Sequence, residues 1–335
     1  MFRLTSLRPL SLRFRAPTSA SFATVRRGTG SRFPPTPTRF DPNQGSGGGY
    51  QYFQQRSVPF YQNKRNLTIV GGGAGLVGLY YATHLETVPI SNRTRFMDMT
   101  KEDEEMMGKQ AFEETMREFG KAIVPAYHPT AQFVHRVARD IIRVSGIKDV
   151  DWEIYLIDSP QKNAFVIPGG KVFVFTGILP VTQDEHGLAA VLGHEVAHQL
   201  ARHSAEKLSS MKIIFLGQVL LNFVFDAQFL TRLLVDVGVI KPFSRLMETE
   251  ADYIGLQLMA QACYDPDAAA DMWKRMKQLD TDPAHSKYLS THPSHDNRIQ
   301  KITEWLPEAR RIRENSDCHQ IAPFLTLFNR SVFGH

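Results

Sequence analysis

The chain has 335 residues, 42% of them hydrophobic, which is enough for one large domain with a packed core. Its net charge of +5 is unevenly spread: residues 1–66 hold eleven Lys and Arg and one acid, leaving 28 of the 39 basic and 33 of the 34 acidic residues for the remainder. A nucleic-acid-binding domain would carry basic charge on a folded surface, so no nucleic-acid partner is expected. The two cysteines form no CxxC pair, which excludes a paired-thiolate zinc site and a disulfide scaffold.

The N-terminal region is typical of a targeting sequence. Residues 1–40 are rich in Arg and Ser and contain no acid, the composition of a mitochondrial transit peptide. A basic tail without a targeting role is the alternative. Residues 41–65 are rich in Gly and Gln, and we interpret them as a disordered linker.

Residues 66–85 contain no formally charged side chain. A helix of this length is about 30 Å long, which matches the hydrocarbon layer of a bilayer. The same stretch contains G-x-G-x-x-G at Gly73–Gly78, but a dinucleotide-binding turn also needs a following strand and a suitably placed acid. The sequence therefore favours one transmembrane helix, with a flavin or nicotinamide oxidoreductase as the weaker alternative. Lys64 and Arg65 precede the helix, so the positive-inside rule places the N-terminus in the matrix and the rest in the intermembrane space.

Residues 95–335 are predicted to form one α+β domain, with long helices and a small sheet. Hydrophobic spacing and turn residues predict helices over about 100–124 and 131–146 and strands over 152–158, 163–167 and 171–176. Thr182 and Glu185 fit a capping box, which predicts a long helix from there to about Ser209.

That long helix carries the motif His194-Glu195-Val196-Ala197-His198. His194 and His198 are four residues apart, so they share a helix face and can bind one metal ion. Glu195 lies near enough to take a proton from an attacking water. Two imidazoles with one carboxylate and an open position suit catalytic Zn²⁺. A chance HExxH is the alternative, but the apolar surroundings make unpartnered histidines costly.

A second helix offers the third ligand. The extended motif HExxHxxGxxH is absent, and we interpret His203 as a structural or surface histidine. Glu248 and Asp252 are four residues apart on one face, so one can bind the metal while the other supports a histidine. Glu250 points elsewhere. A solvated acidic face is the alternative.

HExxH followed by S-R-x-x-E-x-E-A-D-x-x-G, from Ser244 to Gly255, resembles the membrane metallopeptidases that include HtpX and the CAAX prenyl proteases. The similarity extends from about residue 130 to 305. The resemblance implies a zincin-like (gluzincin) metallopeptidase domain with one Zn²⁺ held by His194, His198 and Glu248, and Asp252 behind them. It also implies Glu195 as the general base.

Two further elements resemble parts of this family. "NAFV", formed by Asn163, Ala164, Phe165 and Val166, is similar to the strand that pairs with substrate. "THPSHDNRI" is similar to an H-P-x-x-x-x-R-I element and implies a catalytic role for His292 in stabilising the oxyanion. The alternative for His292 is an ordinary loop histidine.

The transit peptide, single span and "VPISNRTRF" are most similar to the Oma branch, mitochondrial inner-membrane metalloendopeptidases whose activity overlaps that of the m-AAA protease. This resemblance implies cleavage of membrane proteins in quality control or stress, including dynamin-like fusion GTPases in animals. Membrane-protein substrates, inner-membrane lipid and a second copy of the chain are the expected partners. A catalytically silent, zinc-containing membrane scaffold is the alternative.

Two later features leave alternatives open. The thirteen largely apolar residues Ile213–Phe225 are too few to span a bilayer, so they predict either a membrane contact or a buried helix. Cys263 and Cys318 either form a disulfide, which the intermembrane space would permit, or stay as free buried thiols.

Overall fold

The computed structural model describes residues 64–88, 90–225, 241–278 and 297–316, together with the single positions 288, 292 and 318. All of them belong to one compact unit, Ser57–His335. The predicted transit peptide, and the predicted linker up to residue 63, lie outside the described residues.

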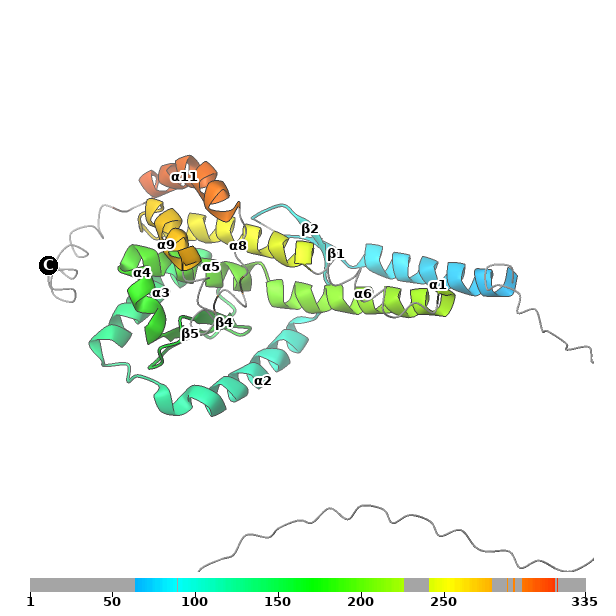
Figure 1. Ribbon diagram of the computed structural model, residues 1–335, viewed down its shortest axis with the longest axis horizontal. Helices are drawn as coiled ribbons and strands as arrows, with labels where there is room; N and C mark the ends of the chain where they lie inside the picture. Colours follow the sequence, from blue (N-terminus) through cyan, green and yellow to red (C-terminus); the bar gives the residue numbers. More distant parts are fainter. Residues whose placement is uncertain are drawn as a thin grey trace, which may run out of the picture. The chain divides into compact units, whose positions relative to one another are not determined.

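Helices dominate this unit, beside two small sheets, as the α+β prediction requires (Figure 1). The helices are α1 (Lys64–Thr83), α2 (Lys101–Phe119), α3 (Pro129–Ser145), α4 (Leu179–Thr182), α5 (Glu185–Leu200), α6 (His203–Phe225), α8 (Lys241–Gln261), α9 (Asp267–Gln278) and α11 (Arg298–Glu314), with 3₁₀ turns at Gly120–Ala122 and Thr176–Ile178. The strands are β1 (Leu85–Thr87), β2 (Thr94–Phe96), β3 (Glu153–Ile157), β4 (Ala164–Ile167) and β5 (Lys171–Phe175).

β1 and β2 form an antiparallel hairpin directly after α1. The other sheet has the order β3-β5-β4, with β3 parallel and β4 antiparallel to the central strand β5. β4 is therefore an edge strand, and it packs against α5. The expected strands are all present, within one or two residues at their ends.

The predicted long helix is wrong in two respects. Its N-cap is Asp184, whose carboxylate accepts a hydrogen bond from the Gly187 amide, whereas Thr182 ends the separate helix α4. The helix also stops at Leu200, because Arg202 adopts a positive φ of 52°, and a new helix begins at His203. Two helices, α5 and α6, thus replace the single one expected.

α5 lies at the centre of the core. Most of its side chains are buried, and it packs against α3, α8 and α9 (Figure 1). Its crossing with α8 is closest at Gly193 and Gly255: a Cβ added at Gly193 would lie 2.7 Å from the carbonyl oxygen of Gly255. Only glycines allow the two backbones to approach this closely, and the crossing brings residues of α8 beside those of α5.

α1 and α6 lie side by side and antiparallel, at the end of the unit that carries the β1–β2 hairpin (Figure 1). α1 has no buried residue, and apolar side chains on both helices are exposed, including Leu76 at 70% and Phe215 at 62%. The described part of Ile213–Phe225 is therefore not a buried core helix.

The prediction for residues 66–85 is met in part. A helix is present, but among the described residues no helix combines the length and hydropathy that a membrane span requires. Five glycines lower the hydropathy of α1. Gly73–Gly78 lies inside continuous helix rather than in a turn between strand and helix, so the structure contradicts the dinucleotide-binding alternative.

Candidate active site

His194 and His198 lie one turn apart on α5, and their Nε2 atoms are 3.1 Å apart. Glu248, reaching across from α8, places its carboxylate oxygens 3.3 Å from His194 Nε2 and 3.5 Å from His198 Nε2. His194 and Glu248 are buried. The structure therefore brings together the three side chains that the sequence nominated as metal ligands.

These separations suit a tetrahedral metal ion. Zinc binds imidazole nitrogen and carboxylate oxygen at about 2.0–2.2 Å in a tetrahedral arrangement, which places neighbouring donor atoms about 3.3–3.5 Å apart. The observed separations of 3.1, 3.3 and 3.5 Å agree with that requirement. The residues present thus fit the metal that the motif implies.

The pKa values of these donor side chains are shifted strongly from their ordinary values. Burial raises the pKa of Glu248, but hydrogen bonds from His194 and His292 outweigh it and hold this pKa far below its usual range. Burial lowers the pKa of His194, yet the carboxylates of Asp252 and Glu248 raise it to about 9. Burial lowers the pKa of His198 well below its ordinary value. Glu248 is therefore ionised at neutral pH, as a metal ligand must be.

Asp252 lies behind His194, as expected for a supporting carboxylate. Its Oδ1 is 2.9 Å from His194 Nδ1 and accepts a hydrogen bond of 2.6 Å from Arg298. The Arg298 guanidinium stacks on Trp273, with 3.3 Å between its Cζ and the ring centroid. Trp273 and Arg298 thus fix the carboxylate that fixes His194.

Glu195 points to the same site and is only 2% exposed. Its Oε1 accepts a 2.7 Å hydrogen bond from the Tyr288 hydroxyl and lies 3.6 Å from His292 Nε2. The other ring nitrogen of His292, Nδ1, is 3.2 Å from both His194 Nε2 and Glu248 Oε1. His292 therefore lies among the nominated ligands, not on a remote loop.

Sequence reasoning missed several contributors. Tyr288 precedes His292 by four residues, a helical spacing that could have linked them. His203 was expected to be either a structural or a surface histidine; it is 4% exposed and therefore structural, and its Nδ1 lies 2.8 Å from His198 Nδ1. Glu250 does not join the metal donors, as expected, but it contacts His203.

The strand predicted to pair with substrate packs against α5, the helix that carries His194 and His198. Ala164, Phe165 and Val166 lie in β4, and Asn163 immediately precedes it. The Asn163 carbonyl oxygen accepts a 3.0 Å hydrogen bond from the Phe175 amide, while its buried side-chain oxygen has no hydrogen-bond partner among the residues that the structure describes. The outer edge of β4 carries no partner strand among the described residues.

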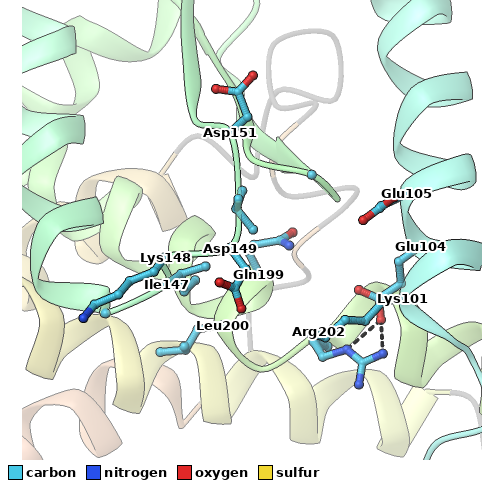
Figure 2. A pocket seen from close by; sticks show the side chains of 13 residues that line it. Lys101, Glu104, Glu105, Ile147, Lys148, Asp149, Asp151, Gln199, Leu200 and Arg202 are labelled. Atoms are coloured by element: carbon cyan, nitrogen blue, oxygen red, sulfur yellow. Dashed lines mark hydrogen bonds and ion pairs between the residues drawn. The ribbon is translucent and has the colours of Figure 1, made fainter.

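A pocket of about 550 Å³ opens beside the end of α5 (Figure 2). Gln199 and Leu200, directly after His198, form part of its wall, and Gly169, in the turn after β4, forms another. Charged side chains of α2, and both charged and apolar residues of the loop after α3, complete the lining, and Arg202 donates a 2.6 Å hydrogen bond to Glu104. The pocket thus adjoins both the metal-binding helix and the end of the edge strand.

Cys263 and Cys318 form a disulfide, with Cα atoms 5.4 Å apart. Of the two alternatives left open by the sequence, the structure contains the bridged one. It ties the residues after α11 to the segment after α8.

A buried HExxH helix, crossed by a second helix whose glutamate lies beside both histidines, is the arrangement of a metallopeptidase. The sequence model of peptidase family M48 matches residues 129–306, more than half of the chain. The chain therefore belongs to peptidase family M48.

Curated relatives narrow this assignment. The mitochondrial metalloendopeptidase OMA1 of Schizosaccharomyces pombe is 50% identical over 285 residues, covering 83% of this chain and 82% of the relative. The protein of that name from Saccharomyces cerevisiae is 36% identical, covering 79% and 81%. The human metalloendopeptidase OMA1 is 35% identical, covering 77% of this chain and 53% of the relative. The chain is thus a mitochondrial metalloendopeptidase.

Proposed function

We propose that the chain is a zinc-dependent endopeptidase of the mitochondrial inner membrane that cleaves membrane proteins in quality control or stress. The observation that carries this proposal is the convergence of His194, His198 and Glu248, with donor atoms 3.1–3.5 Å apart, beside the buried Glu195. When bound, zinc would act as a Lewis acid that polarises the scissile carbonyl and favours deprotonation of water.

Glu195 is the proposed general base. Its carboxylate takes a proton from the attacking water and passes it to the leaving amine. The Tyr288 hydroxyl, 2.7 Å from Oε1, fixes the orientation of this carboxylate. His292, 3.6 Å from the same oxygen, is placed to stabilise the oxyanion that forms on the attacked carbonyl.

We propose that substrate binds extended along the outer edge of β4, by backbone hydrogen bonds that need no particular side chains. Asn163, Ala164, Phe165 and Val166 supply this edge, and the pocket at Gly169 and Leu200 lies where the paired peptide leaves the strand. An extended binding mode suits a protease that cleaves unfolded or loosened segments of protein substrates.

α1 is the proposed membrane anchor, with α6 alongside as a second contact. Exposed apolar side chains on both helices support this, as do Lys64 and Arg65 at the first turn of α1. The disulfide supports a catalytic domain in the intermembrane space, because disulfides persist outside the reducing matrix. Protease treatment of mitochondria with ruptured outer membranes should degrade the domain, and its protection would place it in the matrix instead.

The peptides released in mitochondria provide the functional test. Mitochondria with the wild-type chain should yield cleavage products of membrane proteins that are missing when Glu195 is replaced in Glu195→Gln. Identical peptide profiles would favour the silent scaffold.

A further inference from the structure

Behind His198 lies a buried cluster of charged and polar side chains that the proposed catalytic steps do not use. It joins His203 and Glu206 of α6 to Glu250 of α8 and to Arg93 and Arg95 of the β1–β2 hairpin. Glu206, Glu250 and Arg95 are each no more than 5% exposed. Side chains from three separate elements thus meet one helical turn from a proposed metal ligand.

Although His203, Glu206 and Glu250 could by themselves hold a metal ion, a side-chain cation already lies between them. Arg93 donates to Glu206 Oε1 at 2.6 Å and to Glu250 Oε2 at 2.9 Å. Arg95 donates to Glu206 Oε2 at 3.2 Å. Arg93 therefore bridges the two carboxylates, Arg95 is shared between Glu206 and Glu86, and the cluster is an ion-pair network rather than a second metal site.

The hydrogen bonds within this cluster set the tautomer of His198. Glu250 Oε2 lies 3.0 Å from His203 Nε2, and an ionised carboxylate can only accept, so His203 carries its proton on Nε2. In neutral His203, Nδ1 then has a free lone pair that can accept the proton of His198 Nδ1, 2.8 Å away. His198 Nε2 is left unprotonated and faces the donors of His194 and Glu248, as a metal ligand must.

We propose that His203 and Glu250 are positioning residues that hold His198 in its metal-binding tautomer and orientation, and that Arg93 connects them to the hairpin after α1. This inference rests on the proposed metal role of His198. His194 has a direct carboxylate partner in Asp252, whereas His198 obtains its carboxylate through a second imidazole. Through Arg93 the arrangement also links the α1 end of the unit to the metal centre.

Zinc affinity of the purified full chain, measured by competition with a chromogenic chelator, tests the proposal. Loss of a group that orients a metal ligand weakens metal affinity about 10- to 100-fold. We expect that loss in His203→Phe, which keeps a ring but no hydrogen bond, and in Glu250→Gln, which replaces the charged acceptor of the His203 Nε2 proton with a neutral amide. His203→Gln, which offers both an acceptor and a donor, should recover part of it.

Glu206→Gln is the matched control, because it removes a buried carboxylate of the same cluster whose hydrogen bonds go to Arg93 and Arg95 rather than to His203. Its zinc affinity should stay within about threefold of wild type, well below the effect expected for a group that orients a ligand. At saturating zinc, KM of His203→Phe should equal that of wild type, since the residue does not touch substrate.

Several results would overturn the proposal. One is zinc affinity within threefold of wild type in both His203→Phe and Glu250→Gln; another is an equal loss in Glu206→Gln. Glu250→Gln, which keeps the side-chain volume, decides the matter if His203→Phe does not fold. A wild-type chain that binds no zinc would instead defeat the proposed function itself, so the two failures are distinguishable.

Discussion

The two histidines of the HExxH motif differ in how the surrounding protein supports them. His194 contacts the carboxylate of Asp252 directly, and Arg298 holds that carboxylate in place. His198 reaches Glu250 only through His203. The comparison teaches that the two histidines of one motif can be held in place by different parts of the fold. The side chains that support His194 come from α8 and α11 within the core, whereas those that support His198 come from α6, α8 and the hairpin after α1.

The same comparison shows why one side could be predicted and the other could not. His194, His198, Glu248 and Asp252 follow from four-residue spacing on two helices, and the family motif adds that these helices meet. On a continuous helix, a residue five positions after His198 would point about 140° away from it, because each residue turns by about 100°. The helix ends at Arg202, and the change of chain direction there brings His203 into contact with His198. No periodic pattern in the sequence predicts this helix end.

Most of the fold was also accessible to sequence reasoning. The strands β3, β4 and β5 and the helices before residue 180 follow from alternation, helical spacing and turn residues, whereas the β1–β2 hairpin was not predicted. The helix crossing at Gly193 and Gly255 could not be predicted from the sequence, because it depends on how closely two backbones approach each other. Tyr288 escaped notice because its contact with Glu195 joins positions 93 residues apart.

The largest expected effect distinguishes the proposed metal ligand Glu248 from its neighbour Glu250 on the same helix, α8. Glu248→Gln should lose both zinc and at least about 10³-fold in proteolytic rate, since the Lewis acid that catalysis needs is lost with its carboxylate ligand. Glu250→Gln, assayed at saturating zinc, should keep most of its activity. Metal analysis and cleavage of a denatured protein substrate check both, and the reverse order would reassign the third ligand.

The next largest effect is expected at the crossing of α5 and α8, which brings the residues that support His194 and His198 together. Gly255→Ala would place a Cβ 2.7 Å from the His194 backbone nitrogen, so urea unfolding of the apoprotein should show a loss of about 1–3 kcal/mol. Gly217→Ala in α6, where a Cβ would meet nothing within 4 Å, is the control and should not destabilise the chain. Equal unfolding midpoints for Gly255→Ala and wild type would show that the crossing is not tight.

A double-mutant cycle tests whether the two sides act independently. Asp252→Asn and Glu250→Gln should each weaken zinc binding about 10- to 100-fold. If each carboxylate orients its own histidine, the two factors should multiply in the double variant to within about threefold. A double variant no weaker than the worse single one would show that both carboxylates act on one shared element.

A smaller effect concerns pH and the His198 side alone. Burial raises the pKa of Glu250, but hydrogen bonds from His203 and Arg93 outweigh it and lower this pKa from its ordinary 4.5 to about 2. A carboxyl whose pKa is depressed on folding stabilises the fold above its unfolded value and loses that contribution as pH falls through the folded value. The stability advantage of apo wild type over apo Glu250→Gln should therefore shrink between pH 4.5 and 2. A gap independent of pH in calorimetry would contradict this.

The zinc content of purified Glu195→Gln, measured together with its proteolytic activity, tests the central claim most directly. Glu195 is not among the proposed ligands, so the variant should hold one zinc per chain, as the wild type does, and should lose proteolysis by at least about 10²-fold, the contribution typical of a general base. Proteolysis retained with zinc in place would remove Glu195 from catalysis, and zinc lost together with activity would show that Glu195 helps to bind the metal.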